Sequence, residues 1–205
     1  MMTMTRLMRY ARLGVPQFAF TAILAAATGA TPAATVLEMT PSETKVEFTL
    51  GGLLHTVHGT FALKRGNLRF DPATGQASGE LVVDAKSGAS GSGARDKRMH
   101  ANVLESDRYP EIVFRPDRVD GKVEPQGVSK VQIHGMFAIH GAEHEITMPA
   151  EVTADGGNYT TTAHFSVPYV KWGMKDPSNL ILKVNKEVDI VIHTVARPVR
   201  EHVSN

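Results

Sequence analysis

From about residue 38 onward, hydrophobic and polar residues alternate along the chain. Val46, Phe48 and Leu50 are separated by polar neighbours, and the same period of two recurs from residue 57 to residue 63. Such alternation is typical of strands with one buried face. Further strands are predicted at residues 68–70, 79–85, 111–115, 131–139, 145–152, 159–167 and 182–195.

Residues that favour turns separate these segments. Gly66-Asn67, Asp71-Pro72, Asp120-Gly121, His140-Gly141 and Asp155-Gly156-Gly157 lie in the gaps. Glycine, asparagine and aspartate tolerate the backbone angles of tight turns, and proline fixes one of them. The pattern therefore predicts a succession of antiparallel hairpins.

One stretch departs from the period of two. Residues 87–93 are rich in glycine and serine, which predicts a flexible segment, and residues 94–102 are compatible with two helical turns. About eight strands with one short helical crossover favour an all-β fold, a closed antiparallel barrel, because closure removes exposed sheet edges. A β-sandwich is the alternative. Of these two folds, only the barrel encloses a lumen, which at eight strands can hold one small ligand.

The N-terminal 34 residues have a different composition. Arg6, Arg9 and Arg12 precede an apolar stretch at 18–27 and a run of small residues. This layout is typical of a secretory signal peptide, with cleavage expected between Ala30 and Ala34. An uncleaved anchor or a mitochondrial presequence is the alternative. The apolar stretch is shorter than the roughly 20 residues that span a bilayer, so we expect no stable membrane span.

The predicted organisation is therefore a signal peptide at 1–34, a barrel domain at 35–197 and a short tail at 198–205, in a periplasmic protein. The sequence has 22 Lys and Arg against 21 Asp and Glu, and removing the first 34 residues deletes three arginines and no acid. No basic excess remains, which argues against nucleic acid as a partner. The absence of cysteine excludes disulfides, thiolate zinc sites and a cysteine nucleophile.

The histidines and serines give no convincing catalytic or metal centre. His55 and His58 are three residues apart, so on a strand they would point to opposite faces. His140 and His144 flank a predicted turn, where we expect exposed side chains rather than metal ligands. No Gly-x-Ser-x-Gly elbow is present, and the glycines at 88–93 are not followed by a P-loop lysine. We therefore expect no enzyme activity, no metal and no cofactor.

The apolar face of the predicted strands is the remaining candidate for function. It is either a packed core or the wall of an apolar tunnel, and periodicity does not choose between them. The candidate ligand-binding residues are Phe48, Val57, Phe61, Leu63, Phe114, Ile133, Phe137, Ile139, Met148, Phe165, Trp172 and Ile190.

Several motifs in the same order resemble those of the YceI-like family. The most specific are the run from Arg95 to Met99 and the run from Tyr109 to Phe114. Gly59-Thr60-Phe61, Phe70-Asp71-Pro72 and the run from Gly135 to Gly141 are similar to three further family signatures. Departures from the family pattern lie at residues 136–138 and 170–176.

The resemblance implies a periplasmic, lipocalin-like barrel that binds, stores or transports a polyisoprenoid, a quinone-like lipid or a fatty amphiphile without covalent chemistry. It leaves a homodimer open. Arg95 and Asp96 are expected to tie the helix to the sheet rather than to contact ligand. The alternatives are a structural or stress-associated protein with a filled barrel and, less favoured, a histidine-dependent metal-binding protein.

Overall fold

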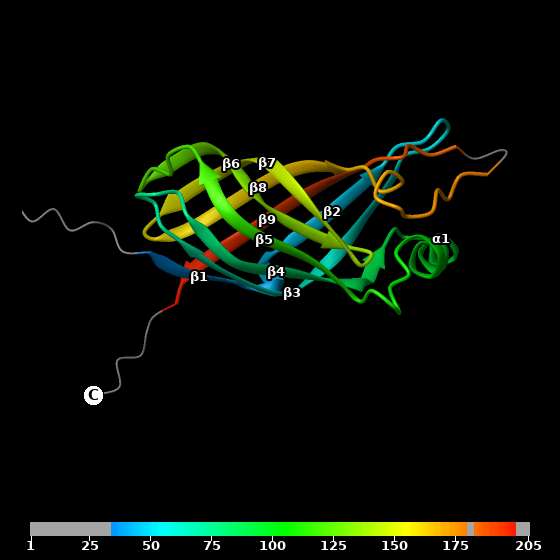
Figure 1. The fold of residues 1–205 in the computed structure, drawn as a ribbon, viewed down its shortest axis with the longest axis horizontal. Helices are drawn as coiled ribbons and strands as arrows, with labels where there is room; N and C mark the ends of the chain where they lie inside the picture. The colour runs from blue at the N-terminus through cyan, green and yellow to red at the C-terminus, as the bar shows by residue number, and fades with distance from the viewer. Residues whose placement is uncertain (1–33, 180–182, 200–205) are drawn as a thin grey trace, which may run out of the picture. The chain divides into compact units, whose positions relative to one another are not determined.

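The computed structural model describes residues 34–179 and 183–199, which form an antiparallel barrel with one short α-helix (Figure 1). The fold predicted from the sequence is confirmed. The strands are β1 (Thr35–Met39), β2 (Lys45–Leu50), β3 (Val57–Phe70), β4 (Ala77–Ala89), β5 (Glu111–Asp120), β6 (Gly127–Ile139), β7 (Ala142–Asp155), β8 (Asn158–Val167) and β9 (Val188–Pro198).

Nine strand segments fill eight positions in the barrel wall. β2 pairs with β3 and β9, and the wall continues through β8, β7, β6, β5 and β4 back to β3. β1 pairs with the same two strands further along, with Met39 opposite Gly66 and Leu37 opposite Pro198. A 3₁₀ turn at Pro41–Glu43 separates β1 from β2. The two segments therefore act as one interrupted strand between β3 and β9.

The turn predicted at Gly66-Asn67 is wrong, because β3 runs unbroken from Val57 to Phe70. Gly66 lies between Met39 of β1 and Leu81 of β4. A Cβ atom on Gly66 would lie 3.0 Å from the Met39 side chain. The glycine therefore serves close packing of neighbouring strands. Irregularities in the pairing between β3 and β4 instead bend the strand.

The crossover between β4 and β5 contains α1 (Gly93–Arg98), which continues into a π-helical turn at Met99–Val103. The predicted helix thus forms close to its expected place, whereas the residues predicted to be flexible belong partly to β4, which extends to Ala89. Figure 1 shows α1 at one end of the barrel, the end where the β2–β3 loop also projects. We call this the α1 end. No helix in residues 34–179 or 183–199 is long and apolar enough to cross a membrane.

Candidate ligand-binding cavity

The two halves of the barrel interior differ in how tightly they are packed. On β9, Ile190 and Ile192 point into the α1 end and are only half-buried, whereas Ala196, near the other end, is 3% exposed. On β3, Phe61 is half-buried and Leu63 is 4% exposed. Inward-facing side chains that keep solvent-accessible surface indicate a hollow interior. The barrel is therefore filled at one end and hollow at the α1 end.

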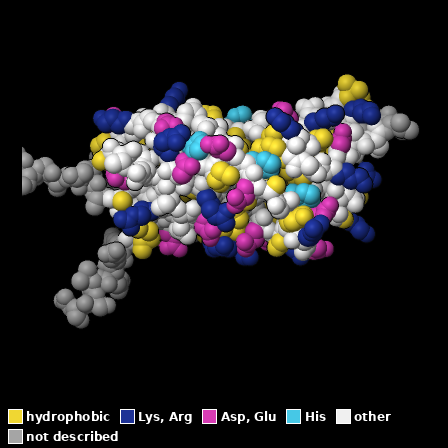
Figure 2. Space-filling model, viewed as in Figure 1, with side chains coloured by type: hydrophobic (Ala, Val, Ile, Leu, Met, Phe, Trp, Pro, Cys, Tyr) yellow, Lys and Arg dark blue, Asp and Glu magenta, His cyan; other side chains and the backbone are white. Residues whose placement is uncertain are grey.

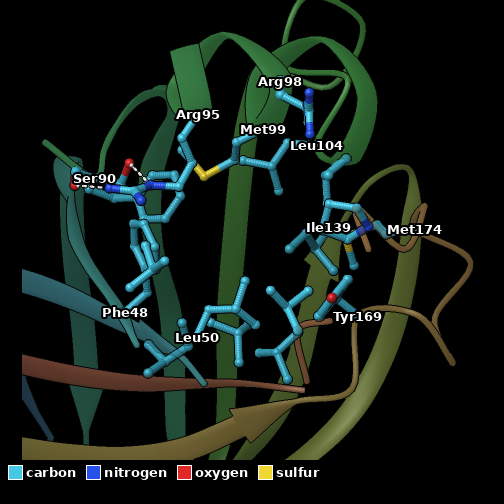
Figure 3. Close-up of a pocket in the computed structure, with 18 of the residues that line it drawn as sticks. Phe48, Leu50, Ser90, Arg95, Arg98, Met99, Leu104, Ile139, Tyr169 and Met174 are labelled. Atoms are coloured by element: carbon cyan, nitrogen blue, oxygen red, sulfur yellow. Dashed lines mark hydrogen bonds between the residues drawn. The ribbon is translucent and has the colours of Figure 1, made fainter. Parts of the chain in front are cut away.

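The hollow is a cavity of about 470 Å³. Its walls are mainly apolar side chains from β2, β3, β6, β8 and β9, and α1 with the following π turn covers it from above (Figure 3). Among the described residues, no Asp or Glu lines it. The apolar wall includes Val46, Phe48, Leu50, Val57, Phe61, Val83, Ile112, Phe137, Ile139, Phe165, Val167, Val188, Ile190 and Ile192.

An aromatic pair shapes one wall of the cavity. The rings of Phe48 on β2 and Phe61 on β3 have centroids 5.4 Å apart. Gly59 makes this possible, because a Cβ atom there would lie 2.3 Å from the Phe48 ring and 2.4 Å from the carbonyl oxygen of Ala89. The missing side chain lets the Phe48 ring lie close to the β3 backbone.

The crossover forms the roof. Met99, Val103 and Leu104 line the cavity from this side. Nε2 of His100 lies 2.9 Å from the Gly88 carbonyl oxygen, so this nitrogen donates a hydrogen bond. Nδ1 then accepts from the hydroxyl of Ser106, which is 3% exposed, at 3.2 Å. The bond to Gly88 ties the roof to the end of β4, and the bond from Ser106 lies within the crossover.

Arg95 and Asp96 both bind Ser90, as the sequence analysis expected for residues that tie the helix to the sheet. Arg95 donates from Nε to the Ser90 hydroxyl at 2.7 Å and from a terminal nitrogen to the Ser90 carbonyl at 2.9 Å. The Asp96 carboxylate accepts from the Ser90 backbone N–H at 2.9 Å and from its hydroxyl. Hydrogen bonds from the Ser90 side chain are the main reason that the pKa of Asp96 is lowered. Arg95 also lines the cavity (Figure 3).

The segment between β8 and β9 closes the opposite side of the mouth. Tyr169 and Met174 line the cavity and are 5% and 3% exposed. The Tyr169 hydroxyl donates to the carbonyl oxygen of Asn185 at 2.7 Å. Burial, with a smaller contribution from Asp176, raises the pKa of Tyr169 to about 12. The hydroxyl therefore stays protonated and keeps this segment attached.

Seven of the candidate residues named from the sequence line the cavity, namely Phe48, Val57, Phe61, Phe137, Ile139, Phe165 and Ile190. The other five do not. Leu63, Phe114 and Met148 lie in the packed core, and half-buried Ile133 packs against it. Trp172 stacks on His144 of β7 and also contacts Phe137, which lines the cavity. Trp172 therefore lies between the cavity wall and β7.

Sequence reasoning missed the roof and, apart from Trp172, the segment after β8. Met99 and Leu104 come from the crossover, and Tyr169 and Met174 come from the segment after β8. Neither segment alternates with a period of two, so the strand pattern gave no signal for them.

The expectation that His140 and His144 are exposed is wrong. His140 opens the two-residue β6–β7 turn with a positive φ of 52°, and its Nε2 is buried 3.6 Å from a Glu105 oxygen. His144 lies on the inward face of β7, opposite Phe137. Burial lowers the pKa of His144. A tight turn of two residues places both side chains against the crossover and the interior rather than in solvent.

The described residues do not bring three His, Asp or Glu side chains together as a metal site. His55 lines the cavity mouth, while His58 lies on β3 and contacts Thr49 at 3.0 Å. The titratable groups that line the cavity are Arg95, Arg98, Lys183, His55 and Tyr169. With no carboxylate among these described lining residues, the arrangement suits apolar binding with cations at the mouth rather than acid–base chemistry.

Three solved structures resemble this barrel, at sequence identities that show the fold alone. Burkholderia cenocepacia BcnA is 20% identical with a TM-score of 0.64, covering 77% of this chain and 98% of BcnA. A polyisoprenoid binding domain from Saccharophagus degradans, implicated in plant cell wall breakdown, is 14% identical with a TM-score of 0.62, covering 80% of this chain and 99% of that domain. The Campylobacter jejuni YceI protein is 15% identical with a TM-score of 0.53, covering 66% of this chain and 81% of its own.

A sequence search of curated proteins found no match. The family model described as the YceI-like domain matches residues 37–196. This match begins in β1 and ends in β9, so it spans the entire barrel. The chain therefore belongs to the YceI-like domain family.

Proposed function

We propose that this protein binds a hydrophobic or amphiphilic chain non-covalently in the cavity and shields it from water. The observation that carries the proposal is the hollow at the α1 end, which is walled by apolar side chains while the other half of the barrel is packed. Its volume of about 470 Å³ lies within the usual range for small-molecule sites. A polyisoprenoid, a quinone-like tail and a fatty chain share the required chemistry.

The binding energy would come from the apolar wall. Removing one CH₂ group from water contributes roughly 0.8 kcal/mol, so a chain of several carbons binds without a polar anchor. The polar groups at the mouth then select the head group. This mechanism requires no cofactor and no chemical step, in keeping with a binding protein rather than an enzyme.

Family membership supports the same proposal. The Saccharophagus degradans domain that shares the fold is named as polyisoprenoid binding. The layout of the first 34 residues, which lie almost entirely outside the described part of the chain, favours export to the periplasm. We propose storage or transport of a lipid there. A barrel filled by its own side chains is the alternative, and the hollow half argues against it.

The first test is identification of a copurified ligand. Protein purified without detergent would be extracted with organic solvent, and the extract analysed by mass spectrometry. A stoichiometric lipid is expected. An empty extract would be followed by titration with the neutral fluorescent probe N-phenylnaphthylamine, and failure to bind this probe would rule out the proposal.

A pair of neighbouring substitutions tests whether the cavity is the site. Ile190 lines the cavity, whereas Val191 faces outward, opposite Glu47 and His164. Ile190→Trp should fill the hollow, weaken probe binding by at least tenfold and leave the melting temperature nearly unchanged. Val191→Trp should leave probe binding unchanged. Equal effects of the two variants would contradict binding in the lumen.

A further inference from the structure

The tip of the β2–β3 loop carries two adjacent exposed leucines. Leu53 is 79% exposed and Leu54 is 62% exposed, more than any other large hydrophobic residue in the described chain. Figure 1 shows this loop projecting beyond the barrel wall at the α1 end. Exposed leucines at a projecting tip are unfavourable in water and point to a surface that becomes covered.

These leucines adjoin the cavity and a cationic strand. Leu54 itself lines the cavity mouth. The backbone N–H of Leu53 donates to the carbonyl oxygen of Lys183 at 3.0 Å, and Gly52 pairs with Val184. The apolar tip and Lys183 therefore belong to one short two-stranded extension beside the mouth.

Cations frame the same opening. Arg95, Arg98 and Lys183 all line the mouth, and neither Arg98 nor Lys183 forms an ion pair with a described residue. Figure 2 shows several Lys and Arg side chains at this end of the barrel, and others along the rest of the visible face. The mouth thus combines exposed apolar side chains with positive charge.

The charge is unevenly distributed between this end and the rest of the barrel. The described segments that join strands at the α1 end, residues 51–56, 90–110, 140–141, 168–179 and 183–187, hold eight Lys or Arg against five Asp or Glu. The remaining described chain holds ten against fifteen. An anionic surface therefore attracts this end more strongly than the rest of the barrel.

We infer that the α1 end docks on the surface of an anionic lipid bilayer, with Leu53 and Leu54 entering the interface and Arg95, Arg98 and Lys183 facing lipid phosphates. Apolar insertion together with several cations gives reversible binding, because each contribution alone is small. A second copy of this chain is the less suitable occupant, since two such ends carry the same charge. Docking in this orientation places the cavity mouth against the membrane, where an apolar chain can move between bilayer and barrel without crossing water.

Single cysteine variants test the orientation, because the sequence contains no cysteine. Leu53→Cys and Val128→Cys would each be labelled with an environment-sensitive nitrobenzoxadiazole dye. Val128 is the control because it is 58% exposed and lies at the start of β6, far from the α1 end in Figure 1. On vesicles of equimolar phosphatidylcholine and phosphatidylglycerol, the dye at residue 53 should shift to the blue and brighten, and the dye at residue 128 should not.

Charge and apolar variants test the two contributions. Arg98→Gln combined with Lys183→Gln should weaken partitioning into the anionic vesicles by at least about tenfold. Lys122→Gln combined with Lys130→Gln, which removes two charges near Val128, should have little effect. Leu53→Ser combined with Leu54→Ser should also weaken partitioning. All variants share the same N-terminal segment, so differences among them report on the barrel.

Three results would overturn the inference: no dye shift at residue 53, equal shifts at residues 53 and 128, or equal binding to vesicles of phosphatidylcholine alone. Sedimentation that shows a dimer lost in the Leu53→Ser, Leu54→Ser variant would assign the leucines to a self-interface and would also overturn it. Docking is separable from the proposed function, because probe binding in the cavity is measured without vesicles.

Discussion

The imidazole of His144 lies flat against the indole of Trp172, with ring centroids 4.0 Å apart and planes 5° from parallel. His144 comes from β7, and Trp172 comes from the segment after β8 that closes the cavity mouth. Nε2 of His144 is buried without a hydrogen-bond partner in the described structure. Protonation would place a charge at this buried nitrogen, so burial favours a neutral imidazole.

Titration of Trp172 fluorescence should report the state of His144, because Trp172 is the only tryptophan. An imidazolium quenches a stacked indole, so emission should fall as the pH falls, with a midpoint below the ordinary histidine pKa of about 6.5. His144→Gln should remove the transition. A midpoint at or above the ordinary value would contradict the effect of burial on this pKa.

The same pair predicts a pH-dependent stability. A histidine with a lowered pKa binds fewer protons in the folded chain than in the unfolded chain. Its contribution to the stability of the fold is therefore present above about pH 6.5 and is lost as the pH falls toward the folded pKa. The melting temperature of the wild type should therefore drop more between about pH 7 and about pH 5 than that of His144→Phe. Parallel curves for the two proteins would disprove the assignment.

His134 should act in the opposite direction. Its Nδ1 lies 2.6 Å from Asp117 and its Nε2 lies 2.8 Å from Glu145, so both nitrogens donate when the ring is protonated. The hydrogen bond to Asp117 is the main reason that its pKa is raised. The stabilisation should be present below the unfolded pKa and disappear as the pH rises through the folded pKa.

Comparison of His134→Gln with the wild type checks this. The variant should have a lower urea midpoint at mildly acidic pH, where the carboxylates are still ionised, and the difference should vanish in alkaline solution. A difference that grows with pH would show that the neutral ring, not the imidazolium, makes the important contacts.

Gly59→Ala should destabilise the barrel by about 1–3 kcal/mol, a usual cost of overpacking. Its Cβ would collide with the Phe48 ring and with the Ala89 carbonyl oxygen, and backbone atoms cannot move aside cheaply. Gly93→Ala is the matched control, because a Cβ there meets nothing within 4 Å. Urea denaturation of both variants gives the comparison, and equal midpoints would show that Phe48 repacks freely.

Tyr169→Phe should loosen the segment that closes the mouth. The substitution keeps the ring but removes the hydrogen bond to the Asn185 carbonyl, which costs about 0.5–1.5 kcal/mol. Hydrogen exchange at residues 169–174 should become faster, while the strands β6 and β7 keep their protection. Unchanged exchange in this segment would mean that Met174 and Trp172 hold it without the hydroxyl.

The strands were predictable because one face of each is buried. On β6, the buried positions Val131, Phe137 and Ile139 follow the period of two that the sequence shows. Register was harder to predict. The residues around Gly66 do not distinguish a turn from a close approach of two strands, because both favour a residue without a side chain. The two cases are distinguished only by the neighbouring strands, which place Met39 and Leu81 opposite Gly66.

The cavity was predictable only in part, for a similar reason. Phe61 and Leu63 are both apolar and both point inward, yet one lines the hollow and the other is packed. Whether an inward-facing side chain is packed or lines the hollow depends on the side chains across the barrel. The alternation along one strand carries no information about these. The same limit applies to His144, whose burial is decided by Trp172 from another segment.

The pairing of the interrupted first strand with β9 determines when the barrel can close. β9 occupies the place between β8 and β2, and the backbone N–H of Val199 donates to the carbonyl oxygen of Val36 at 2.9 Å. The wall is thus sealed by its earliest and latest segments, contacts that carry the largest loop-closure entropy in the chain. A nascent chain that still lacks residues 188–198 exposes two open sheet edges. Final folding must therefore wait until residues 188–198 are available, and until then the open sheet edges can pair with other chains.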